Sequence, residues 1–158
     1  MTSLSENFTF AEHTRTSQRY PEVPKPAEIA ALTALCVNVL EPIRAHFHKP
    51  ARINSGYRSQ KVNAAVGSSP RSQHRKGEAS DIEIDGVSTA ERAIWVHANL
   101  ALDRAVLENH KKGKSNSGWV HVAYSAAARR GGSTGINAVT TLTIGANGKP
   151  SYAAGIHA

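Results

Sequence analysis

The stretch SSPRSQHRKGEASDIEID, residues 68–85, joins a polar loop to an alternating run of polar and apolar residues. The alternation has a period of two, which predicts a strand over 79–85. The two faces of this strand carry different residues: Ala79, Asp81, Glu83 and Asp85 on one, Ile82 and Ile84 on the other. A carboxylate on an inward-facing strand needs a partner that neutralises its charge. The stretch therefore raises the question of what partner Asp81 has.

The chain around this stretch predicts a long helix and two shorter ones. Apolar residues recur at helical spacing over 27–47, and Pro42 is expected to bend that helix or to begin a new segment. The shorter helices are expected at 59–67, closed by Gly67, and at 88–100, where Ser88 and Glu91 form a capping box. Residues 1–26 are expected to be irregular, and residues 68–77 to form a loop.

Further strands are expected at 52–55, 104–108, 119–124 and 139–144, the last followed by a turn at Asn147 and Gly148. Helices and strands follow one another without a regular βαβ order. This arrangement predicts an α+β fold in which an antiparallel sheet core is flanked by helices. A chain of 158 residues suits a single domain over 1–158.

Composition limits the classes of protein to consider. The net charge of +7 favours an anionic partner, such as an acidic wall polymer, an outer-membrane polymer or a lipid surface. The basic residues are scattered and aromatic residues are few, so no nucleic acid is expected, and a solvated basic surface is the simpler interpretation. The lone Cys36 excludes an internal disulfide and fits a small core residue.

Neither a secretory signal nor a transmembrane segment is expected in this sequence, so any export would use another route. Its start, MTSLSENFTFAEH, has neither the basic residues nor the apolar run of a signal peptide, so synthesis in the cytoplasm is expected. The longest apolar stretch, residues 29–40, is too short to cross a bilayer, so no transmembrane segment is expected.

A metal ion bound by Asp81 together with two histidines could be the partner that neutralises the charge of Asp81. A hydrolytic zinc site uses three protein ligands and leaves one position open for water. If the strands at 79–85 and 119–124 pair antiparallel, Asp81 and His121 become near neighbours on one face. His74 can fold back over that face because Gly77 allows a tight turn. The alternative is a hydrogen-bonded histidine and aspartate with a structural role.

The stretch SGYRSQKVNAAVGSSPRSQHRKGEASDIEI, followed by GWVHVAY, resembles the zinc D-alanyl-D-alanine carboxypeptidase family. The family includes phage endolysin peptidases and shares its fold with the Hedgehog signalling domain. Its motif Ser-x-His-x-x-Gly-x-Ala-x-Asp is matched by Ser72, His74, Gly77, Ala79 and Asp81, and its downstream histidine by His121. The resemblance implies that His74, Asp81 and His121 bind Zn²⁺, which makes zinc the expected cofactor.

The resemblance also implies roles for residues around the metal. Arg58, in SGYRS, is expected to bind a substrate carboxylate or the oxyanion, and Ser72 and Gln73 to shape the rim of the site. Many relatives carry an acid three residues before the last histidine, where this chain has Gly118. The small single-domain branch instead has a glutamate at the end of the preceding strand, matched here by Glu108.

Glu108 is therefore the preferred general base, although an ordinary exposed glutamate at a strand end remains the alternative. His110 is the next candidate and Asp103 the one after it. The loop 109–118 is longer than that branch leads one to expect.

The resemblance implies a zinc-dependent peptidoglycan peptidase, either an endopeptidase of the endolysin type or a D-alanyl-D-alanine carboxypeptidase, from a phage, a prophage or a bacterium. The expected reaction is hydrolysis of an amide bond in a stem peptide or a cross-link, by a monomer that acts on the cell wall, in the periplasm, after its release. The alternative from another class is a non-enzymatic, zinc-stabilised module that binds the wall, because a fold does not determine a function.

Overall fold

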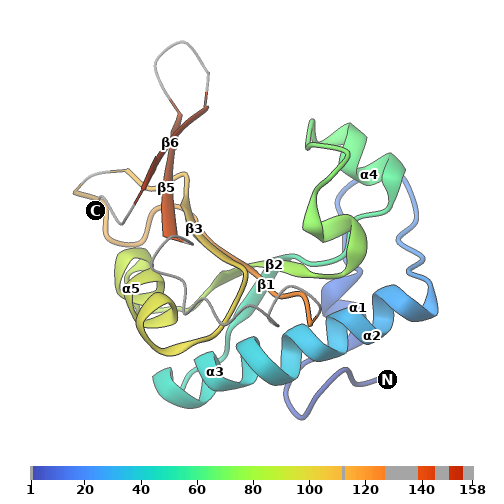
Figure 1. The fold of residues 1–158 in the computed structure, drawn as a ribbon, viewed down its shortest axis with the longest axis horizontal. Helices are drawn as coiled ribbons and strands as arrows, with labels where there is room; N and C mark the ends of the chain where they lie inside the picture. The colour runs from blue at the N-terminus through green and yellow to red at the C-terminus, as the bar shows by residue number, and fades with distance from the viewer. Residues whose placement is uncertain (1, 112, 127–138, 145–149, 155–158) are drawn as a thin grey trace.

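The computed structural model describes residues 2–111, 113–126, 139–144 and 150–154 (Figure 1). Six strands in these ranges form one sheet in the order β1-β2-β4-β3-β5-β6. The strands are β1 (Arg52–Ser55), β2 (Ala79–Glu83), β3 (Arg104–Glu108), β4 (Trp119–Ala123), β5 (Val139–Ile144) and β6 (Pro150–Ala154). The helical elements are α1 (Phe10–His13), α2 (Pro26–Leu35), η1 (Cys36–Leu40), α3 (Glu41–Phe47), α4 (Gln60–Ala65), η2 (Gln73–Lys76) and α5 (Thr89–Asn99). The predicted α+β fold class is confirmed.

The sequence predicts an antiparallel sheet, but the sheet in the structure is mixed. The pairs β1–β2, β2–β4, β3–β4 and β5–β6 are antiparallel, but β3 and β5 are parallel. Ala123 at the end of β4 and Val139 at the start of β5 both lie beside the first residues of β3. Strand β5 therefore begins at the end of the sheet where β4 finishes, runs opposite to β4, and so runs parallel to β3.

Helices α2 and α3 are joined by the π-helical turn η1 into one helix over Pro26–Phe47. The N–H of Glu41 donates to the carbonyl of Cys36, five residues earlier, and Pro42 follows in the first turn of α3, where a missing N–H is tolerated. The helix is therefore continuous at Pro42, and the change predicted there is the switch from π-helical to α-helical hydrogen bonding at Glu41. By length and composition alone this helix of 22 residues could cross a membrane, and it is longer than the apolar stretch 29–40.

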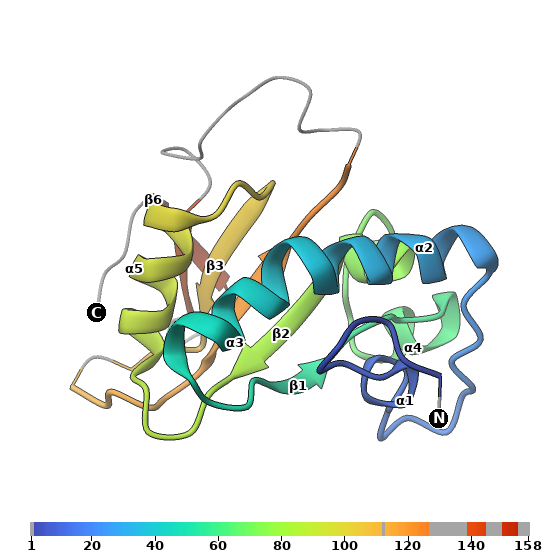
Figure 2. The same ribbon diagram turned by 90° about the horizontal axis from the view of Figure 1, so that it is seen from below.

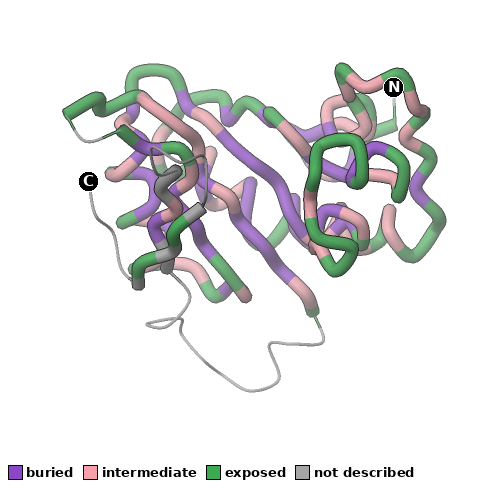
Figure 3. The backbone as a smooth tube through the Cα atoms, turned by 90° about the horizontal axis from the view of Figure 1, so that it is seen from above, coloured by how far each residue is buried: buried purple, intermediate pink, exposed green. Residues whose placement is uncertain are grey.

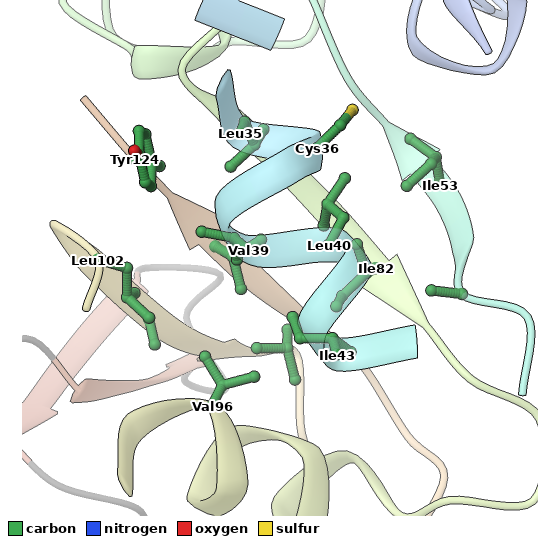
Figure 4. Packing of buried hydrophobic residues seen from close by; sticks show 14 of the residues in the cluster. Leu35, Cys36, Val39, Leu40, Ile43, Ile53, Ile82, Val96, Leu102 and Tyr124 are labelled. Atoms are coloured by element: carbon green, nitrogen blue, oxygen red, sulfur yellow. The ribbon is translucent and has the colours of Figure 1, made fainter. Parts of the chain in front are cut away.

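The apolar face of this helix forms the core with α5 and one face of the sheet. Figure 2 shows α2, α3 and α5 lying in front of the strands. In Figure 4, Leu40 and Ile43 lie near Ile82, while Leu35 lies on the side of Tyr124. The core residues of the helix, Leu32, Leu35, Cys36, Val39, Leu40 and Ile43, are all fully buried. Cys36 is thus a core residue, as predicted, and burial raises the pKa of its thiol to about 12.

The opposite face of the sheet carries Asp81, Val106, Glu108 and His121 and stays uncovered by α2, α3 and α5. Beside it lies the segment of α4 and η2, whose turns are largely exposed, whereas the central strands are buried (Figure 3). This arrangement leaves the polar face of the strands open to a cleft.

Two short helical elements were missed by the sequence analysis. The region 1–26 contains α1, whose start is a capping box of Thr9 and Glu12. The predicted loop 68–77 contains the 3₁₀ turn η2, which ends at Gly77 with φ of 71°. A Cβ atom at Gly77 would lie 2.3 Å from the carbonyl oxygen of Glu28, so glycine also allows η2 to pack on α2.

The other predicted helices and strands lie close to their expected positions in the described part of the chain. Helix α4 begins after Ser59, and the Ser88 hydroxyl accepts from the N–H of Glu91 at the start of α5. Strands β1, β3, β4 and β5 lie where expected. Strand β6 was not predicted, and the expected turn at residues 147–148 lies outside the described residues.

Candidate metal centre

His74, Asp81 and His121 bring three donor atoms together on the open face of the sheet. Nε2 of His74 lies 3.2 Å from Nδ1 of His121, which lies 2.9 Å from Oδ1 of Asp81. The third distance, from Nε2 of His74 to Oδ1 of Asp81, is 3.3 Å. Zinc–ligand bonds of about 2.0–2.1 Å at tetrahedral angles separate two ligand atoms by about 3.3 Å. The three donors are therefore spaced like three corners of a tetrahedral zinc site.

The sheet register places two of these residues. Asp81 on β2 lies directly opposite His121 on β4, in an antiparallel pair. The predicted pairing is thus confirmed, and side chains that are opposite in such a pair lie on the same face. The 3₁₀ turn η2 then carries His74 over that face.

The ring of His74 has a fixed orientation and tautomer. Its Nδ1 lies 2.7 Å from the carbonyl oxygen of Gly56, which can only accept, so Nδ1 carries the proton. In the neutral ring, Nε2 then has its lone pair free and directed at the other two donors, the arrangement found in metal-binding histidines. Gly56 is itself held against α1, since a Cβ atom there would lie 2.5 Å from the carbonyl oxygen of His13.

Asp81 is buried but strongly favours its charged form. Burial alone raises the pKa of its carboxyl, yet the neighbouring His74 and the hydrogen bond from His121 outweigh that effect and hold the pKa well below its ordinary value. Three donors with one buried negative charge form a set that suits a divalent cation such as Zn²⁺.

Arg58 lies beside the three donors, as the sequence analysis expected of a site residue. Its Nη2 donates to Oδ2 of Asp81 at 2.8 Å, and its Nε donates to the hydroxyl of Ser55 at 2.8 Å. The side chain retains 17% exposure and lines the cleft. Arg58 therefore orients the carboxylate of Asp81, a contact that sequence reasoning did not foresee, and its predicted contact with substrate stays a prediction.

Two cavities meet at this centre and form one cleft. The first, of about 790 Å³, is lined by His74, His121 and Glu108. The second, of about 630 Å³, lies on the other side of Arg58 and Asp81. Trp119 lines both. The two cavities therefore adjoin at Arg58, Asp81 and Trp119, next to the three donor atoms.

Glu108 lies in the first cavity and shares a sheet face with His121. Its neighbour across the strands is Trp119, whose indole Nε1 donates to Oε2 of Glu108 at 2.9 Å. Burial raises the pKa of Glu108 and the charge of Asp81 raises it further, while His121 and the bond from Trp119 act against this rise. A partly buried carboxylate with a raised pKa suits proton transfer near neutral pH. The structure thus places Glu108 in the cleft and not on an outer surface.

The other predicted site residues lie at the rim or outside the cleft. Ser72 and Gln73 line the first cavity, and Nε2 of Gln73 donates to Oδ2 of Asp103 at 3.1 Å. Asp103 and His110 are absent from the described lining of both cavities. His110 is buried, with Nδ1 3.3 Å from the carbonyl oxygen of Ser117. Unlike Glu108, neither Asp103 nor His110 is among the described residues that line the two cavities.

Comparison with protein families matches residues 6–123 to peptidase M15. The chain belongs to the peptidase M15 family. This match covers every residue of the cleft named above, and it implies a zinc-dependent metallopeptidase. A search of curated proteins found no match for the chain.

Two residues near the centre were not singled out from the sequence. Gly56 supplies the carbonyl that orients His74, and Trp119 supplies the donor to Glu108. Gly56 belongs to the SGYRS stretch and Trp119 to WVHV, so both lay inside motifs already noted. Their contacts depend on tertiary packing, which spacing along the chain does not report.

Proposed function

We propose that this M15 peptidase is a zinc-dependent peptidoglycan hydrolase of the endolysin type, which cuts an amide bond in a stem peptide or a cross-link. The observation that carries the proposal is the convergence of His74, Asp81 and His121 beside the partly buried carboxylate of Glu108 in one cleft. The motif from Ser72 to Asp81 resembles enzymes with this substrate, which supports the choice of peptidoglycan.

In this proposal His74, Asp81 and His121 hold the ion. Zinc bound there would lower the pKa of a coordinated water toward about 7 and polarise the scissile carbonyl. Glu108 accepts a proton from the attacking water and can then give it to the leaving amine. Arg58 holds Asp81 in place with Nη2 and presents its remaining donors to the carboxylate or oxyanion of the substrate. Ser72 and Gln73 shape the rim.

The net charge of +7 supports an additional proposal about location. A basic surface adheres to anionic wall or outer-membrane polymers, which would hold the enzyme near its substrate. In this scheme a monomer is made in the cytoplasm and reaches the wall after release.

Metal analysis tests the proposal. Protein purified in zinc-containing buffer should carry one zinc per chain, and chelation should abolish hydrolysis of wall peptides until zinc is restored. A His74→Ala, His121→Ala double variant should lose both zinc and activity, while His46→Ala, which alters an exposed histidine outside the cleft, should keep both. Zinc bound one to one without hydrolysis of any wall peptide would instead favour the non-enzymatic binding module.

A further inference from the structure

The second cavity of the cleft has a lining of its own. It is formed by the segment 15–18 after α1, by Glu22, and by residues 54–58 around the end of β1. It joins the metal centre at Arg58, Asp81 and Trp119, which line both cavities. Its volume of about 630 Å³ is large enough for an amino acid residue of a bound peptide. A group bound in this cavity would lie beside Arg58 and Asp81.

Two oppositely charged side chains of this lining, Arg15 and Glu22, form no ion pair among the described residues. Arg58 pairs with Asp81, and Glu83 pairs with Arg52. Across the described ranges, none of the ion pairs involves Arg15 or Glu22, although both line the same cavity.

Arg15 is anchored but keeps most of its hydrogen-bonding capacity. Its Nη2 donates to the carbonyl oxygen of Ile53 at 3.2 Å, which fixes the guanidinium above β1. A guanidinium has five N–H donors in a planar fork, so further donors remain to bind a carboxylate.

Glu22 has one carboxylate oxygen in use and one without a partner. Oε2 accepts from the N–H of Ser59 at the start of α4. Oε1 is buried and has no hydrogen-bond partner among the described residues. A buried carboxylate oxygen without a donor is costly. Because Glu22 also lines the cavity, a ligand donor that reached Oε1 from the cavity would remove this cost. The donor that best fits a carboxylate is a cation such as an ammonium group.

We propose that this cavity is a subsite for a zwitterionic α-amino acid group of the substrate, with its ammonium bound by Glu22 and its carboxylate bound by Arg15. The inference rests on the proposed function and names the residue of the stem peptide that it recognises: a diamino dicarboxylic acid whose far end carries both charges. Cross-linking acylates that amine and removes its positive charge. The subsite therefore selects stem peptides that are not cross-linked through this residue.

Binding of small probes tests the subsite without hydrolysis of a stem peptide. Three derivatives of diaminopimelate serve as probes, and in each the amine and the carboxyl on one α-carbon are blocked. At the other α-carbon the first probe keeps both groups free, the second has its amine acetylated, and the third has its carboxyl amidated. NMR titration of the zinc-loaded full chain should show that the free end binds about tenfold to a hundredfold more tightly than either modified end, the range for a charge-assisted hydrogen bond. Equal affinity for all three probes would overturn the proposal.

Charge-removing variants assign each end of the zwitterion. Glu22→Gln keeps an acceptor for the N–H of Ser59, so the fold should persist. This variant should no longer bind the free probe more tightly than the acetylated probe, but it should still bind the free probe more tightly than the amidated probe. Arg15→Gln should lose the preference over the amidated probe alone. The controls Glu6→Gln and Arg44→Gln change charges outside the cleft and should keep both preferences. Retention of both preferences in Glu22→Gln contradicts the assignment.

Digestion of peptidoglycan by the unmodified enzyme is scored separately. Cleavage of wall peptides together with equal binding of the three probes would overturn the subsite and leave the proposed function standing. Selective binding of the free zwitterion without any cleavage would overturn the proposed hydrolysis and leave the subsite standing.

Discussion

The indole of Trp119 donates a hydrogen bond of 2.9 Å to the carboxylate of Glu108, its cross-strand neighbour in the sheet. The bond holds one oxygen of Glu108 and leaves the other for chemistry in the cleft. Gly118, just before Trp119, lies against the backbone of Glu108 with φ of 73°. The carboxylate of the site therefore comes from Glu108 on β3. Gly118, at the other position considered for an acid, instead allows β3 and β4 to pack closely.

Trp119→Phe removes the donor to Glu108 and keeps an aromatic ring. A hydrogen bond to the charged carboxylate lowers its pKa, so its loss should raise the pKa of Glu108. Because the base must be ionised, the rise of the hydrolytic rate with pH should move by about one pH unit to higher pH. In the unaltered protein the NMR shift of the Trp119 indole N–H should titrate with Glu108. A Trp95→Phe control should change neither the pH dependence of the rate nor the pKa of Glu108. An unchanged pH dependence in Trp119→Phe would contradict the role of the Trp119 hydrogen bond.

Glu108→Gln keeps the size of the side chain and an acceptor for Trp119 but removes the basic carboxylate. We expect the hydrolytic rate to fall by about 10²–10⁴-fold, the usual contribution of an acid–base group, with zinc content and melting temperature unchanged. Steady-state kinetics and elemental analysis measure these quantities. Near-parent activity would show that another group accepts the proton.

Gly118→Ala tests the close packing of the strands. A Cβ atom there would lie 2.0 Å from the carbonyl oxygen of Glu108 and 2.7 Å from the carbonyl carbon of Asn109. Gly113 has φ of 79° with nothing within 4 Å of an added Cβ atom, so Gly113→Ala carries only the backbone strain of about 1–2 kcal/mol. Gly118→Ala should lower the free energy of unfolding well beyond Gly113→Ala in denaturant titrations. Equal losses would mean that the clash relaxes at no cost.

Arg58→Lys keeps the positive charge but cannot make both bonds of the guanidinium, to Asp81 and to Ser55. Residues that orient a metal ligand commonly contribute about 10- to 100-fold to metal affinity. We expect a zinc affinity reduced by this factor in competition with a chelator, and a lower turnover even at saturating zinc. Arg52→Lys, at the Glu83 ion pair, is the control that should keep parental values. Unchanged zinc affinity in Arg58→Lys would exclude the orienting role.

His13 should make the fold sensitive to acid. Burial lowers the pKa of this fully buried imidazole from its ordinary value of 6.5. Protonation therefore favours the unfolded chain: the contribution of His13 is complete above pH 6.5 and is lost as the pH falls through the folded pKa. The slope for one proton is at most about 1.4 kcal/mol per pH unit. Denaturant unfolding of the parent and of His13→Gln, compared between pH 7.5 and 5, isolates this effect. Parallel stability curves would contradict it.

Local pattern predicted most elements of this fold because their signals lie within a few residues. The alternation over 79–85 predicts β2, and Ser88 marks the start of α5. The pairing of Asp81 with His121 followed from strand alternation once the strands were taken as antiparallel. The parallel pairing of β3 and β5 could not be predicted from these local patterns. It depends on which strand edge is still unpaired after β4 has paired with β2 and β3.

The metal-binding residues of the site could be predicted because they belong to a sequence motif. The contacts that tertiary packing creates could not be predicted. His74 and Asp81 lie within eight residues of one another, so spacing could link them. Nothing in spacing indicates that Gly56 accepts from His74, that Trp119 donates to Glu108, or that Glu22 lines a cavity with Arg15. These contacts join segments brought together only by the folded sheet.

Mass spectrometry of peptidoglycan fragments after digestion tests the central claim most directly. The zinc-loaded chain should release fragments with one stem-peptide or cross-link amide bond hydrolysed, identified by the gain of one water. The same fragments should be absent after chelation and strongly reduced with Glu108→Gln. A fully zinc-loaded, folded protein that leaves every amide bond of peptidoglycan intact would contradict the account.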